Sequence, residues 1–242
     1  MTAMTEVRAF PFLDGPSGRF GARLVPLDGA PGAIPCGSLI VEGGLELALA
    51  ELTRRHPDAE RRALLSLWSR HYFYSLIPSV VLSGLIEGRV LPLRLSESAV
   101  VLNGDGVPAA IALPHAGAVD PDVPVPERLI PLARDHLEPL IDGLAVQARL
   151  SPRVLWGNAA GYLHWVVEQL DTSAGADADA LIHSPTWPGG WKNALDEPMR
   201  YADCPDGRQA RRKVCCLLYR VPGRKLCSYC PLPERNQKER PN

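Results

Sequence analysis

Four cysteines near the C-terminal end of this 242-residue chain constrain its fold more than any other sequence feature. They follow the pattern C-C-x10-C-x2-C and are Cys215, Cys216, Cys227 and Cys230. A turn can bring both sulfurs of a C-x2-C pair to one metal centre, and the reversal signal Val221-Pro222-Gly223 would fold the first pair back towards the second. Clustered thiols in a reducing compartment are more often metal ligands than disulfides, so we expect this segment to fold around a metal.

The spacing alone leaves the identity of the metal open. Structural zinc is common at four-cysteine sites, but both members of an adjacent Cys-Cys pair seldom suit one ion, because successive side chains diverge in a strand. A [2Fe–2S] cluster has two irons that each need two thiolates, so adjacent cysteines can span the irons or chelate one of them. A redox dithiol or unligated cysteines are a third interpretation. Cys36 and Cys204 lie outside the pattern, and Cys204 can replace a ligand only if the site rearranges.

Apolar periodicity predicts an α+β fold that is mostly helical, with a small antiparallel hairpin or sheet and the cysteine-rich segment at the C-terminal end. Helices are expected over 45–56, 58–78, 79–87, 126–148 and 151–170, with a break at Pro78 and a kink at Pro139. Strands are expected over 38–41, 90–95, 98–102 and 107–113, with a turn at Asn103–Gly106 and a loop over 171–180. Composition divides the chain into three regions: 1–125, 126–206 and 207–242.

Overall composition excludes several classes of protein. With 26 basic against 27 acidic residues, the chain has no general attraction for nucleic acid. No apolar run approaches the roughly 20 residues that cross a bilayer, and the N-terminal residues lack the pattern of a secretory signal. No nucleotide or flavin motif occurs. We therefore expect a cytoplasmic protein without a nucleic-acid partner.

The cysteine motif, together with the run Val214–Arg220, resembles the ferric-siderophore reductase family typified by FhuF. Upstream, Trp156–Ala160 resembles the Trp-Gly-Asn helix segment of that family. The expected helix with Trp68 and Tyr72, followed by the hairpin of residues 90–113, resembles its N-terminal half. The resemblance covers about residues 45–232.

This resemblance implies a ferric-siderophore reductase, an oxidoreductase with no catalytic residue beyond its cluster. Cys215, Cys216, Cys227 and Cys230 would bind a [2Fe–2S] cluster that passes one electron to Fe³⁺ in a hydroxamate-type siderophore and releases Fe²⁺ in the cytoplasm. The partners implied are the ferric siderophore, an external donor such as a ferredoxin or flavin reductase, and peripheral association with an inner-membrane siderophore importer. The alternative is a non-catalytic iron–sulfur or zinc-stabilised protein that binds siderophores or other partners.

Cations dominate the region between Gly207 and Cys230, which holds no Asp or Glu. These cations would favour the more negative, reduced state of a cluster. They would also attract an acidic electron donor or a negatively charged ferric complex. The alternative is that they simply keep the tail in solution. Trp156 is either core or pocket lining, and His183 lies in a loop that can cover a ligand. The candidate contacts with substrate or donor are Trp156, Asn158, His183, Arg220, Arg224 and Lys225.

Overall fold

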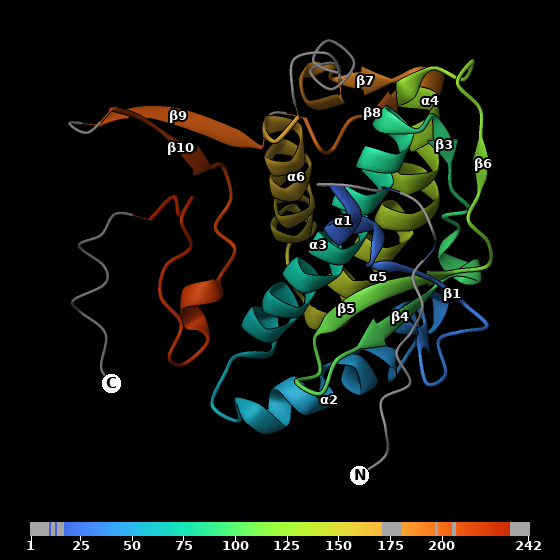
Figure 1. Cartoon of the computed structure of the whole chain (residues 1–242). Helices are drawn as coiled ribbons and strands as arrows, with labels where there is room; N and C mark the ends of the chain where they lie inside the picture. The colour runs from blue at the N-terminus through green and yellow to red at the C-terminus, as the bar shows by residue number, and fades with distance from the viewer. Residues whose placement is uncertain are drawn as a thin grey trace.

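The computed structural model describes residues 10, 13, 17–170, 181–196, 198–204 and 207–232, with only the backbone described for 202–204 and 207–209. The predicted loop over 171–180 therefore lies outside the described residues. The remainder is mostly helical with small sheets, as predicted, and the cysteine segment lies beside the α3–α6 pair (Figure 1). The labelled α-helices are α1 (Gly18–Gly21), α2 (Gly44–Arg55), α3 (Arg61–Ile86), α4 (Val125–Ile130), α5 (Glu138–Ala148) and α6 (Pro152–Glu168), of which α1 is a single turn.

Helix α3 forms the centre of the molecule and is buried over most of its circumference. It packs against α6 on one side and against the sheet strand β5 (Pro108–Leu113) on another. A helix surrounded in this way lacks a polar face, so its buried serines donate to main-chain carbonyls, some within the helix and some on neighbouring segments. Ser69 donates to the Ser66 carbonyl at 2.9 Å, and Ser83 donates to the Val80 carbonyl at 3.0 Å.

The predicted helix break at Pro78 is wrong, because α3 continues through this proline to Ile86. Proline removes one intrahelical hydrogen bond, and packing can outweigh that loss when both flanks of the helix are buried. Residues 75–84 are all buried, so the helix retains its core contacts on both sides of Pro78. The two predicted helices of this region are one element.

The predicted helix over 126–148 is present but changes its winding. Between α4 and α5 lies η4 (Pro131–Leu137), a π-helical stretch, so the irregularity precedes Pro139. Pro139 lies in the first turn of α5, where a missing N–H costs little. The other short helical turns are η2 (Cys36–Ile40), η3 (Leu95–Glu97), η6 (Pro188–Gly190) and η7 (Leu218–Arg220).

The largest sheet is mixed, with the strand order β1-β5-β4-β2. Its centre is the predicted antiparallel hairpin, in which Val100 faces Ile111, while β1 runs parallel to β5. The strands of this sheet are β1 (Leu24–Pro26), β2 (Ile34–Pro35), β4 (Ala99–Leu102) and β5. Figure 1 shows the hairpin beside α3.

Two predicted strands are wrong and two hairpins were not predicted. Residues 36–40 form η2 where a strand over 38–41 was expected, and only the start of the strand expected over 90–95 pairs. Short pairs without strong alternation leave little signal in a sequence. The remaining strands are β3 (Arg89–Val90) with β6 (Ala118–Val119), β7 (Thr186–Trp187) with β8 (Trp191–Lys192), and β9 (Met199–Cys204) with β10 (Gly207–Arg212).

A buried polar chain connects α3 to η4 and η2. The Leu93 carbonyl can only accept, so Nδ1 of His136 donates to it at 2.9 Å and Nε2 accepts from the Tyr72 hydroxyl at 2.6 Å. The Cys36 thiol then donates to the Tyr72 oxygen at 3.1 Å. Burial lowers the pKa of His136 to about 4 and raises the pKa of Cys36 to about 11, so both groups are neutral at pH 7.

Replacing Tyr72 with phenylalanine is expected to lower the free energy of unfolding by about 1–3 kcal/mol, because His136 and Cys36 would lose their shared partner in the core. Chemical denaturation measures this difference. The control Tyr74→Phe alters a half-buried tyrosine on the same helix and should change stability by less than about 0.5 kcal/mol. Equal effects of the two variants would contradict the buried chain.

Candidate metal centre

The cysteine segment is attached to α3 and α6 by buried hydrogen bonds. Ser66, on α3, donates its hydroxyl to the Cys216 carbonyl at 2.6 Å. The side-chain amide of Asn158, on α6, donates to Oγ of Ser66 at 2.9 Å and to Oγ of Ser69 at 3.1 Å. The amide oxygen of Asn158 accepts from the Arg212 guanidinium at 2.8 Å, so one side chain links both helices to the start of the cysteine segment.

Two glycines of α6 allow this close approach. A Cβ atom at Gly157 would lie 3.5 Å from Cβ of Val214, and one at Gly161 would lie 3.6 Å from the Arg212 guanidinium. These are contact distances for a methyl group, so a larger side chain at either position would push the segment away. The Gly157 carbonyl also accepts a hydrogen bond from Arg212.

The cysteine sulfurs lie close together but are not joined. Sγ of Cys216 lies 3.4 Å from Sγ of Cys227, well beyond the roughly 2.05 Å of a disulfide. Two thiolates on one tetrahedral ion with bonds of about 2.3 Å would lie about 3.8 Å apart, which is near the observed separation. The Cys230 N–H donates to the Cys227 carbonyl at 3.0 Å and closes the C-x2-C turn.

The four motif cysteines are only partly gathered in the structure, with Cys216 and Cys227 as the close pair. In the described part of the chain, no three Cys, His, Asp or Glu side chains gather closely enough to hold a metal together. A single-ion site needs its donors around one point, whereas a [2Fe–2S] cluster takes its thiolates in pairs. Cys216 and Cys230 are buried, and Cys215 and Cys227 are half-buried, so the thiols have the chemistry and the shelter that such a cluster needs.

Two arginines place positive charge beside the sulfurs. Nη1 of Arg70 lies 3.5 Å from Sγ of Cys216. The hydrogen bond between Cys216 and Cys227 lowers the pKa of Cys216 to about 5, and the charges of Arg70 and Arg212 lower it as well. The same hydrogen bond, together with burial, raises the pKa of Cys227. These arginines stabilise anionic sulfur, which is the form that binds metal.

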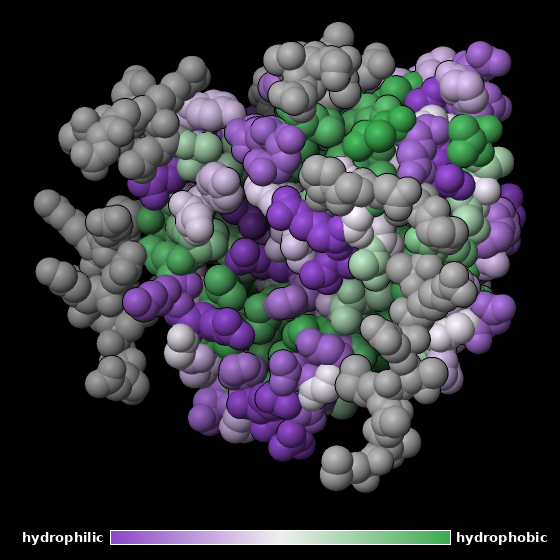
Figure 2. Space-filling view, viewed as in Figure 1, coloured by the Kyte–Doolittle hydropathy of each residue, from purple (hydrophilic) through white to green (hydrophobic). Residues whose placement is uncertain are grey.

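A cavity of about 1220 Å³ adjoins the cysteine segment. Arg70, Asn158 and Arg212 belong both to its wall and to the contacts of the cysteine segment, so the centre and the cavity share side chains. The volume exceeds the roughly 300–1,000 Å³ of pockets for drug-sized ligands. Figure 2 shows mostly hydrophilic side chains around the hollowed centre of this face.

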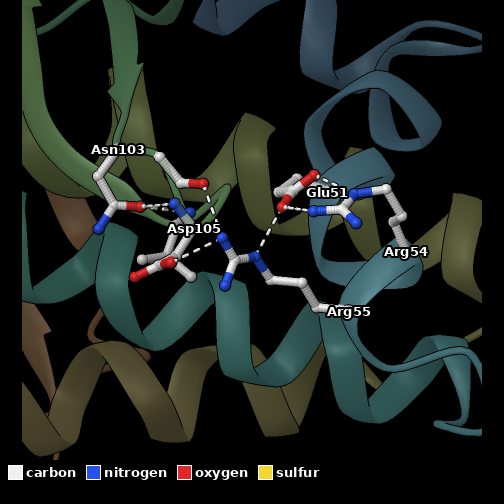
Figure 3. Close-up of polar contacts among 7 residues, drawn as sticks. Glu51, Arg54, Arg55, Asn103 and Asp105 are labelled. Atoms are coloured by element: carbon white, nitrogen blue, oxygen red, sulfur yellow. Dashed lines mark hydrogen bonds and ion pairs between the residues drawn. The ribbon is translucent and has the colours of Figure 1, made fainter.

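At the cavity rim, one ion pair joins Arg55 of α2 to Asp105 in the hairpin turn. Figure 3 shows Arg55 between two carboxylates, with Asp105 at 2.9 Å and Glu51 at 2.6 Å. Oδ1 of Asn103 accepts from the Asp105 N–H at 2.9 Å, which holds the turn that carries this aspartate. Asp105 is the one acidic residue in the described cavity wall, and Arg55 neutralises it.

The structure brings two of the six predicted contact residues, Asn158 and Arg224, to the cavity wall. Trp156 instead packs against Trp191 with ring centroids 6.1 Å apart, and Arg220 pairs with Glu60 at 2.8 Å. His183 and Lys225 are exposed and lie outside the described cavity wall.

Sequence reasoning missed several functional candidates, and it left two cysteines aside. Arg23 and Arg70 line the cavity, but nothing in their local sequence distinguishes them from arginines on the surface of the protein. Cys36 is buried with Tyr72, apart from the motif, as its position in the sequence suggested. The side chain of Cys204 lies outside the described residues.

Comparison with known proteins agrees with this geometry. Residues 66–209 match the family model described as "Ferric iron reductase FhuF-like transporter", and residues 212–232 match the "FhuF 2Fe-2S C-terminal domain". The "Ferric siderophore reductase" of Escherichia coli (strain K12) is 23% identical over 184 residues, which cover 72% of this chain and 67% of that protein.

Solved structures give only a distant likeness. Two structures of the aerobactin synthetase IucA from a hypervirulent pathotype of Klebsiella pneumoniae, one of them ATP-bound, each have a TM-score of 0.48 and 14% identity. Each match covers 76% of this chain, which spans 37% and 36% of those chains, so it assigns neither fold nor activity.

The predicted family resemblance is confirmed, because the larger family model alone covers more than half of the chain. The C-terminal domain model implies a [2Fe–2S] cluster, which decides between the metals that spacing left open. This protein belongs to the FhuF-like ferric iron reductase family of oxidoreductases, with a [2Fe–2S] domain at its C-terminal end.

Proposed function

We propose that this protein reduces Fe³⁺ held by a hydroxamate-type siderophore in the cavity, and that Fe²⁺ is released in the cytoplasm. The observation that supports this most is the shared wall: Arg70, whose Nη1 lies 3.5 Å from Sγ of Cys216, also lines the cavity, and so does Arg212, whose charge lowers the pKa of the same thiol. A ferric complex in the cavity would therefore lie next to the electron source. Siderophore oxygens hold the small, highly charged Fe³⁺ far more strongly than Fe²⁺, so one electron is enough to loosen the iron.

Cys215, Cys216, Cys227 and Cys230 are the proposed cluster ligands. The bound [2Fe–2S] cluster supplies one-electron transfer. Arg70 and Arg212 lie beside Cys216 and favour the more negative, reduced state, because positive charge stabilises added negative charge. Asn158 and Ser66 act as positioning residues, since they hold the segment that carries the first cysteine pair.

The remaining partners are proposals of the same kind. The sequence contains no nucleotide or flavin motif, so we propose that a ferredoxin or a flavin reductase delivers the electron. No helix in the described part of the chain is both long enough and apolar enough to cross a bilayer. We propose a cytoplasmic protein that associates peripherally with an inner-membrane siderophore importer.

The direct test is a single-turnover experiment under anaerobic conditions. Protein reduced with dithionite and freed of reductant is mixed with a ferric trihydroxamate, and the visible spectrum and Fe²⁺ captured by a chelator are followed together. Reoxidation of the protein with about one Fe²⁺ per chain is expected, because the cluster gives one electron. The gallium complex of the same ligand controls for binding without reduction. No reoxidation by the ferric complex would leave a non-catalytic binding protein as the better account.

Replacing any one of the four proposed ligands with serine should lower the iron and acid-labile sulfide content of the anaerobically purified protein to less than about half, since serine oxygen is a poorer ligand for iron–sulfur clusters. Cys36→Ser is the matched control, because Cys36 is buried with Tyr72 away from the motif, and it should keep the wild-type content. Full retention of iron in Cys227→Ser would contradict the ligand assignment.

Replacing Asn158 with alanine should weaken the docking of the cysteine segment and change the paramagnetic-resonance spectrum of the reduced protein. The loss of its buried hydrogen bonds should also lower the free energy of unfolding by about 2–3 kcal/mol. Asn193→Ala is the matched control, since Asn193 is buried and bonded to the Leu181 and Ser184 carbonyls. It should cost similar stability and leave the spectrum unchanged. An unchanged spectrum in Asn158→Ala would contradict the positioning role.

A further inference from the structure

Resting on the proposed function, we infer that the cavity selects ferric siderophores with a net negative charge over neutral ones. The cavity wall holds far more positive than negative charge, although the whole chain has a net charge of −1. Against the single carboxylate of Asp105, its arginines are Arg23, Arg55, Arg70, Arg212 and Arg224. Such a local excess of cations in a concave wall focuses the electric field on an anionic ligand.

Part of this positive charge is already compensated, and part is not. Arg55 is paired with Glu51 and Asp105, and Arg70 and Arg212 face the cysteine sulfurs. Arg23 and Arg224 differ from these, because the structure pairs neither with a carboxylate among its described residues. Arg23 donates to the neutral Ala109 carbonyl at 3.1 Å and keeps its full charge. The uncompensated charge is therefore at Arg23 and Arg224.

Arg70 and a half-buried histidine, His71, lie in the same cavity wall as these two arginines. Burial lowers the pKa of His71, and the charges of Arg70, Arg224 and Arg23 lower it further. The three guanidinium groups come from the segment between α1 and β1, from α3 and from the cysteine loop, and they line one cavity. Cations gathered in one partly desolvated wall repel one another and gain most from an anion placed among them.

An aromatic part of the cavity wall can contact the organic backbone of a siderophore. Tyr74 lies 5.6 Å from Tyr162 and 5.9 Å from Trp165, measured between ring centroids. The guanidinium of Arg23 lies 4.4 Å from the centre of the Tyr74 ring, which holds that cation towards the cavity. An aromatic wall beside fixed cations can bind an amphipathic chelate and orient its charged groups.

Charge balance then distinguishes the siderophore classes. Three singly charged hydroxamates neutralise Fe³⁺, so a simple trihydroxamate complex carries no excess charge. An anionic complex needs additional ionised carboxylates, as in a citrate-centred dihydroxamate, or doubly charged catecholates. Both kinds share the net negative charge that this wall favours, and a hydroxamate siderophore with free carboxylates also keeps the donor type of the proposed function.

The test uses gallium complexes, because Ga³⁺ has the charge of Fe³⁺ and is not reduced. The quenching of tryptophan fluorescence, with Trp165 in the wall, measures the binding of a neutral trihydroxamate, a citrate-centred dihydroxamate and a tris-catecholate to the cluster-loaded protein. Anionic complexes should bind at least about tenfold more tightly than the neutral one at low salt, and this advantage should shrink as salt rises. The two anionic complexes show whether carboxylates or catecholates supply the preferred charge.

A comparison of Arg224→Gln with Arg153→Gln tests whether the preference for anionic complexes arises in the cavity. Both variants remove one exposed arginine, but Arg153 lies in the first turn of α6, outside the described wall. Arg224→Gln should weaken the binding of anionic complexes about tenfold and leave the neutral complex within about twofold, whereas Arg153→Gln should change neither. Equal affinity for neutral and anionic complexes, or equal effects of both variants, would overturn the inference. Because no electron is transferred, these results do not depend on whether the protein reduces iron.

Discussion

The hydrogen bonds of Asn158 are the interaction on which the rest of the site depends. This side chain bonds to two serines of α3 and accepts from Arg212, so it joins the two central helices to the strand that leads into the cysteines. Such a network is stable only if every buried group is satisfied, and here each donor and acceptor has a partner. Gly157 and Gly161 keep the facing surface of α6 low enough for the segment to approach. The position of the cluster domain is thus determined in the helical core.

The same residues connect the electron source to the cavity. Arg212 is only 7% exposed, bonds to Asn158 and lies near the sulfurs, while its guanidinium also forms part of the cavity wall. In the proposed function, this buried cation would stabilise negative charge on the cluster. Arg70 would do the same from α3. The charge that remains for an anionic ferric complex is that of Arg23 and Arg224, which line the same wall.

Much of this could be predicted from the sequence, and the failures have physical causes. Long periodic stretches gave the main helices and the hairpin, because their core contacts repeat at a fixed interval. The cysteine spacing indicated the metal site, and the family resemblance supplied the cluster. The cavity could not be predicted, because Arg23, Arg70 and Arg224 are far apart in the chain and meet only through packing. The helix break predicted at Pro78 is wrong for a related reason, because burial of the residues around it outweighed the tendency of proline to end a helix. The division into three regions stays a prediction.

If substrate binds in the cavity beside the cluster, a paramagnetic metal held by the substrate lies close to the cluster. A chromium(III) complex of the siderophore provides such a metal, because Cr³⁺ is paramagnetic and resists reduction. The spin relaxation of the reduced [2Fe–2S] cluster is measured with the Cr³⁺ complex bound and again with the diamagnetic Ga³⁺ complex bound. Markedly faster relaxation is expected with Cr³⁺, because two paramagnetic centres that share a wall interact magnetically. Identical relaxation with both complexes at saturation would show that the substrate binds elsewhere, away from the cluster.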